Sequence, residues 1–122
     1  MKTLLAVTTF AIFTSAGALA DGPKATSTAA QHAGMAAGSA DLAGAQRHLH
    51  HVLNCLVGPD GQGFDAAAGN PCAAAGGAIA QTSDKEMKEK LQKAANQARA
   101  ALAGTDADAT RKVAGDIEKM LK

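Results

Sequence analysis

The 122-residue sequence carries twelve basic and eleven acidic side chains, for a net charge of +1, and it contains neither tryptophan nor tyrosine. A nearly neutral chain has no electrostatic field to draw it to nucleic acid or to an anionic membrane. Phe64 is the only aromatic residue after residue 20, so the chain has few rings on which bases and sugars could stack. Composition therefore argues against nucleic-acid binding, and the length suffices for one small domain with a thin core.

The first twenty residues predict a secretory signal peptide. Residues 1–20 hold one lysine, a largely apolar stretch interrupted by threonine and serine, and the small-residue ending Ala18-Leu19-Ala20. We expect cleavage before Asp21, which leaves a single helical domain over residues 21–122. The mature protein should be periplasmic or secreted, with no membrane attachment after cleavage.

Two stretches of the chain resemble each other and predict two helical hairpins. Residues 31–56 and 96–121 align without a gap, and in each a helix-forming run is followed by a short polar break and a second periodic run. The predicted helices cover residues 25–37, 41–57, 83–103 and 106–121. Their candidate N-caps are Ser39 or Asp41, Ser83, and Thr105 or Asp106. No alternating β-branched run suggests a strand, so the predicted fold class is all-α, an antiparallel four-helix bundle built from the two hairpins.

A Gly/Pro-rich connection joins the two hairpins and holds the second of the two cysteines. Paired thiols outside the cytoplasm are normally oxidised, so we predict that a Cys55–Cys72 disulfide closes this loop. In the chain-entropy model such a bridge contributes about 3 kcal/mol. The alternative is a pair of free thiols, and Cys55 would then join the neighbouring histidines as a thiolate ligand.

The stretch RHLHHVLNC on the second predicted helix carries three of the four histidines. Helical spacing places His48, His51 and Cys55 in one stripe beside the apolar face, whereas His50 lies on the other flank. If the chain reverses near residues 38–41, His32 on the first helix lies opposite His48, with His51 one turn further along.

Three imidazoles brought together in this way suit a borderline metal ion. The sequence therefore predicts a metal site formed by His32, His48 and His51. Copper is the leading ion, and zinc and nickel are the alternatives. Met35, one turn from His32, is a further candidate because a thioether suits Cu⁺, and His50 and Cys55 complete the set of candidate ligands.

The segments QHAGMAA and GAQRHLHHVL resemble the repeated His-Ala-x-x-Ala hairpins of the small metal-binding proteins, short His-rich periplasmic proteins of bacteria. The resemblance covers roughly residues 30–56 and, without histidines, residues 96–121. It implies binding of copper, nickel or zinc, with His32, His48 and His51 as ligands and His50 as an outer one. The second hairpin has no histidine and that family lacks the cysteine loop, so the resemblance does not extend to high-capacity metal loading.

Two classes of function fit these observations. The first is an exported metal-binding protein that acts as a buffer, carrier or sensor. The second is a non-enzymatic structural or interaction module, in which the histidines are surface residues or a pH-sensitive patch and the stapled loop contacts another periplasmic protein. We expect no enzymatic activity, because the sequence has no Cys-x-x-Cys redox pair, no Gly-x-Ser-x-Gly elbow and no phosphate-binding loop.

Overall fold

The computed structural model describes residues 21–122, and the regular elements in this range are all helical. They are α1 (Gly22–Ala37), α2 (Leu42–Val57), the 3₁₀ turn η1 (Ala66–Ala68), α3 (Ala78–Gln81), α4 (Lys85–Leu102) and α5 (Ala107–Leu121). The predicted all-α class is confirmed, whereas the predicted signal peptide lies outside the described residues. No helix within residues 21–122 is both long enough and apolar enough to cross a membrane.

Aspartate side chains begin three of the long helices. Asp41 accepts a hydrogen bond from the backbone N–H of Gly44, and Asp106 accepts one from that of Ala109, so each satisfies a free donor in the first turn. The third cap is Asp84 and not the predicted Ser83. A carboxylate at this position also interacts favourably with the positive end of the helix dipole, whereas an uncharged hydroxyl does not.

Helix α1 begins three residues earlier than residue 25, where the sequence predicted its start. Pro23 lies in the first turn, where its fixed φ suits a helix and its missing N–H has no intrahelical partner to lose. At the other end, the Ser39 hydroxyl donates to the Met35 carbonyl at 2.8 Å. Ser39 therefore belongs to the end of α1, and Asp41 alone caps α2.

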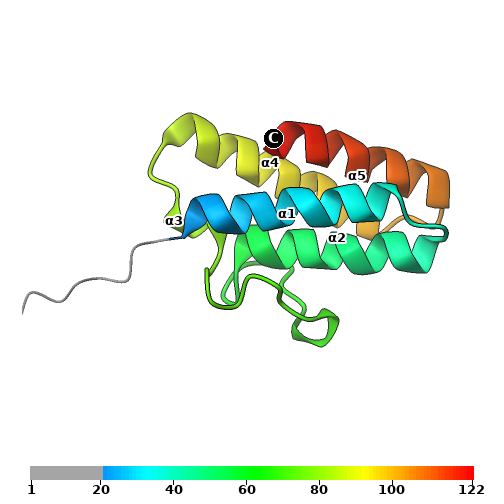
Figure 1. Cartoon of the computed structure of the whole chain (residues 1–122), viewed down its shortest axis with the longest axis horizontal. Coiled ribbons are helices and arrows are strands. Elements are labelled where there is room, and N and C mark those ends of the chain that lie inside the picture. The colour runs from blue at the N-terminus through cyan, green and yellow to red at the C-terminus, as the bar shows by residue number, and fades with distance from the viewer. Residues whose placement is uncertain (1–20) are drawn as a thin grey trace, which may run out of the picture.

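The four long helices contact one another in pairs: α1 packs against α2 and α5, and α4 packs against the same two helices (Figure 1). Two polar contacts tie the turns between them. Arg111 of α5 donates to the carbonyls of Ser39 and Ala40 in the α1–α2 turn. Gln46 of α2 donates to the carbonyls of Leu102 and Gly104 at the α4–α5 turn. Both turns therefore lie at the same end of the molecule.

The large side chains of the core come from α2, α4 and α5, whereas α1 contributes only small residues. The largest fully buried apolar side chains are Leu49, Val52, Leu53, Leu56, Leu91 and Ile117. The buried face of α1 consists of Gly22, Ala25, Ala29, Ala30, Ala33 and Ala36. Small side chains let helix axes approach closely, so a histidine on α1 can reach histidines on α2.

The loop between α2 and α3 is closed by a disulfide. Cys55 and Cys72 are bonded, with their Cα atoms 5.1 Å apart, as the sequence predicted. The two ends of the loop also meet backbone to backbone. A Cβ on Gly58, whose φ is +72°, would lie 2.9 Å from the backbone nitrogen of Gly77. Only glycine fits at this crossing, which fixes where the loop leaves and rejoins the helices.

Candidate metal centre

The structure brings together the three histidines that the sequence predicted as ligands. His48 and His51 lie one turn apart on α2, and His32 faces them from α1. The Nδ1 atom of His32 is 3.3 Å from the Nδ1 atom of His48 and 3.3 Å from that of His51. One ring nitrogen from each histidine lies within 4.8 Å of the other two.

These spacings suit a first-row metal ion. Two nitrogens bound at 2.0–2.1 Å to one tetrahedral ion lie about 3.3–3.4 Å apart, which is the separation of both Nδ1 pairs that involve His32. The rings are not stacked: His51 lies edge-on to His32 and to His48, with interplanar angles of 79° and 76°. His32 and His48 are tilted by 32°, with their ring centroids 5.5 Å apart. All three rings therefore lie close together without parallel stacking.

The other ring nitrogen of His51 has a partner in the disulfide-closed loop. His51 Nε2 lies 2.7 Å from the carbonyl oxygen of Ala68. A carbonyl only accepts hydrogen bonds, so Nε2 carries the proton, and the lone pair of the neutral ring is on Nδ1, the atom that faces His32. Histidines that bind metal commonly donate their second N–H to a carbonyl in this way, which fixes the tautomer and the orientation of the ring.

The electrostatics of the cluster favour uncharged rings. Burial lowers the pKa of His32, and the neighbouring His51 and His48 lower it further. Burial is also the largest cause of the lowered pKa of His48, followed by His51 and Arg47. A lowered pKa keeps the imidazole neutral, and the neutral imidazole is the form that coordinates a metal ion.

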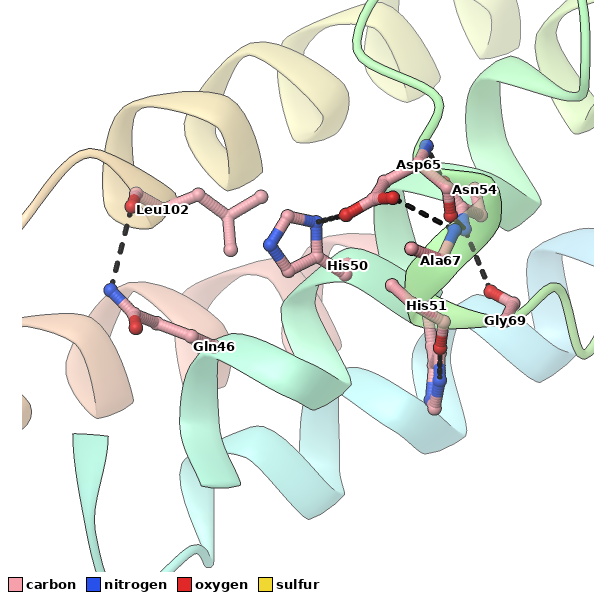
Figure 2. A network of polar contacts seen from close by, with 9 residues as sticks. Gln46, His50, His51, Asn54, Asp65, Ala67, Gly69 and Leu102 are labelled. Carbon is pink, nitrogen blue, oxygen red and sulfur yellow. Dashed lines mark hydrogen bonds and ion pairs between the residues drawn. The ribbon is translucent and has the colours of Figure 1, made fainter. Parts of the chain in front are cut away.

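His50 and Cys55, two of the other candidate ligands, do not belong to this cluster. His50 is on the other flank of α2, where its Nδ1 is 3.7 Å from a carboxylate oxygen of Asp65 and has no hydrogen-bond partner (Figure 2). Met35 is 49% exposed on α1. Cys55 is held in the disulfide and so offers no thiolate.

Sequence reasoning missed two groups next to the cluster, the Ala68 carbonyl and the side chain of Asn54. Asn54 is fully buried on α2. Its NH₂ group donates to the carbonyls of Asp65 and Gly69, and its Oδ1 accepts from the N–H of Asp65 (Figure 2). The one signal in the sequence was a polar residue inside the apolar run LNCLV; a backbone carbonyl leaves no signal.

Comparisons with known proteins add no relative. No family model, curated protein or solved structure matches this chain. The geometry of the histidine cluster and its surroundings therefore has to indicate what this chain binds.

Proposed function

We propose that this protein binds one metal ion through His32, His48 and His51, and that copper is the ion it holds. The observation that carries this proposal is the orientation of His51. Its Nε2 donates to the Ala68 carbonyl while its Nδ1 faces the Nδ1 of His32, which is how a metal-bound histidine is held. A cluster of freely solvated histidines would have no need of a fixed carbonyl partner on the far side of a ring.

The chemistry of the donors supports copper over zinc and nickel. Three imidazole nitrogens are borderline ligands that accept all three ions, and at a given nitrogen site the affinity of divalent ions is highest for Cu²⁺. The lowered pKa values of His32 and His48 keep two of these donors available at mildly acidic pH. In this proposal the protein acts as a metal buffer, carrier or sensor.

We further propose that the protein works in the periplasm or outside the cell and is not an enzyme. The disulfide supports export, because such bonds persist in oxidising compartments, and the predicted signal peptide agrees with it. A binding role is supported by the composition of the cluster, which consists of three imidazoles, a ligand type that suits copper, zinc and nickel. A second periplasmic protein would be the partner for a carrier or a sensor.

The arrangement of the helices that we propose is an antiparallel four-helix bundle made of two hairpins, α1–α2 and α4–α5. Two observations support it. Both α1 and α4 pack against α2 and α5, and Arg111 and Gln46 tie the turns of the two hairpins to the opposite hairpin at one end. This arrangement holds α1 beside α2 over the length that contains the histidines.

The test is a calorimetric titration of Cu²⁺, Zn²⁺ and Ni²⁺ into the mature protein without a purification tag. We expect His32→Ala, His48→Ala and His51→Ala each to lower the affinity for Cu²⁺ by about tenfold or more, because each removes one of three ligands. His50→Ala is the matched control, since it removes an imidazole from the same helix but from the other flank.

Two results would contradict the proposal. If the three substitutions lower the affinity no more than His50→Ala does, the ion binds elsewhere. If the unaltered protein binds none of the three ions more tightly than about millimolar, there is no site, and the interaction module becomes the better account of the histidines.

A further inference from the structure

One turn of α2 carries the hydrogen bonds and the disulfide that attach the loop segment 65–72 to that helix. His51 contacts the Ala68 carbonyl, Asn54 holds the backbone of Asp65 and Gly69, and Cys55 is bonded to Cys72. These residues follow one another at spacings of three and one, so they project from α2 within a single turn. The loop is therefore fastened to the helix at the place where the helix supplies the proposed metal ligands.

Asn54 forms hydrogen bonds to the loop backbone on both sides of Ala68. Its NH₂ group is 2.8 Å from the Asp65 carbonyl and 2.7 Å from the Gly69 carbonyl, and its Oδ1 is 2.9 Å from the Asp65 nitrogen. Every hydrogen-bonding atom of this buried amide is thus used on the loop, which is how a buried polar side chain avoids an unpaired group. The Ala68 carbonyl lies between these two anchor points in the chain.

Two further hydrogen bonds within the loop stiffen it next to the residues that Asn54 holds. The Asp65 side chain caps η1 by accepting from the Ala67 N–H at 2.9 Å. The Asn70 side chain accepts from the Cys72 N–H at 3.0 Å, directly next to the disulfide. Asn54 and the disulfide therefore hold the two ends of a short, internally bonded segment whose middle presents the Ala68 carbonyl to His51.

We propose that Asn54 and the Cys55–Cys72 disulfide are positioning groups for His51 and thereby set the metal affinity of the cluster. They hold the Ala68 carbonyl against Nε2, which keeps the proton on Nε2 and leaves the Nδ1 lone pair facing His32. With the loop released, the ring is free to turn and Nε2–H exchanges its partner for water. This inference rests on the proposed metal site for its effect on affinity, but the state of the His51 proton is a property of the metal-free protein.

The experiment compares variants of α2 by two measurements. Asn54→Ala removes the hydrogen bonds to the loop. The double variant Cys55→Ser with Cys72→Ser removes the disulfide without leaving a thiol that binds metal. Gln46→Ala is the matched control, because Gln46 also donates from α2 to two backbone carbonyls but at the opposite end of the helix. Proton–nitrogen NMR of the metal-free protein at neutral pH reports whether the Nε2–H of His51 is protected from exchange with water, and calorimetry reports the affinity for Cu²⁺.

We expect a protected His51 Nε2–H in the unaltered protein and in Gln46→Ala. Both loop variants should lose this protection and bind Cu²⁺ about 10- to 100-fold more weakly, which is the usual effect of removing the partner of a ligating histidine. If both variants keep the protected proton, or lose it and still bind as tightly as Gln46→Ala, the inference is overturned.

The inference can still be tested if a variant fails to fold or if the protein binds no metal. If Asn54→Ala does not fold, the cysteine double variant and Asp65→Ala decide the question by the same two measurements. Asp65→Ala removes the cap of η1 and the contact with His50, but it leaves the backbone groups that Asn54 holds. If the unaltered protein binds no metal, the proposed function fails, whereas the NMR measurement still shows whether Asn54 and the disulfide position His51.

Discussion

His32 and His48 have pKa values below the usual 6.5 of a histidine, and burial is the first cause in both. In the unfolded chain these rings are neither buried nor held beside the other histidines. The folded state therefore binds a proton on these rings less readily than the unfolded state does. Two of the three proposed metal ligands, His32 and His48, are therefore also residues through which acid destabilises the metal-free fold.

The free energy of unfolding of the metal-free protein should fall as the pH drops below about 6.5. Well above that pH both rings are neutral in the folded and the unfolded state, so they do not make the free energy of unfolding depend on pH. Between 6.5 and the lower folded pKa the unfolded state takes up protons that the folded state does not, so stability is lost as the pH falls. Urea unfolding at pH 7.5 and at pH 5 measures this loss.

The variant His32→Gln with His48→Gln provides the control, because glutamine does not titrate. We expect the difference in unfolding free energy between the two pH values to be smaller in this variant than in the unaltered protein. An unchanged difference would assign the acid sensitivity to other groups.

At the scale of single helices, the caps determine where each begins. The carboxylates of Asp41, Asp84 and Asp106 each accept from a backbone N–H at 2.7 Å. Asp21 also precedes a helix, but its side chain makes no capping hydrogen bond. Among the four long helices described, three thus begin at a hydrogen-bonded aspartate cap, and α1 begins after an unbonded aspartate that serves for comparison.

Asp41→Ala should lower the free energy of unfolding by about 1 kcal/mol, because the Gly44 N–H loses its partner at the start of the helix that carries His48 and His51. Asp21→Ala should change it by a few tenths at most. Thermal unfolding followed by circular dichroism compares the two, and an effect of about 1 kcal/mol corresponds to a shift of about 4–8 °C for a domain of this size. Equal shifts for the two variants would show that the cap at Asp41 is not the cause.

Periodicity and helix caps in the sequence predicted the long helices to within three residues, because each has a repeating apolar face and a polar residue at its start. Helical spacing and the reversal near residue 39 were also enough to place His32 beside His48 and His51. The partner of His51 was beyond prediction for a physical reason. Ala68 contributes a backbone carbonyl, which is the same in every residue, and the loop that positions it has no period.

At the scale of the whole molecule, the disulfide compensates for a core that is rich in alanine. Within residues 21–122 the fully buried leucine, valine and isoleucine side chains come from three helices, and small domains gain little stability from so few. Cys55 and Cys72 are 17 residues apart in sequence, and their bond restricts the unfolded chain.

Replacing both cysteines by serine should lower the free energy of unfolding by about 3 kcal/mol in the chain-entropy model. Urea unfolding of the variant and of the unaltered protein measures the loss. Alkylation followed by intact mass analysis is the companion test, and it should label no cysteine in the native protein before reduction. A loss well under 1 kcal/mol would mean that helix packing alone holds the fold.

The alanine face of α1 has a consequence for hydrogen exchange. The buried face of α1 holds fewer apolar atoms than the leucine- and isoleucine-bearing faces of α2, α4 and α5, so the least free energy is needed to detach α1 locally. Its backbone amides should therefore exchange with solvent faster than those of α4 in the metal-free protein. An ion held by His32 on α1 and by two histidines on α2 would link α1, which detaches most easily, to a helix that buries several large apolar side chains. Loading the site would then slow exchange along α1 while leaving local exchange in α4 nearly unchanged.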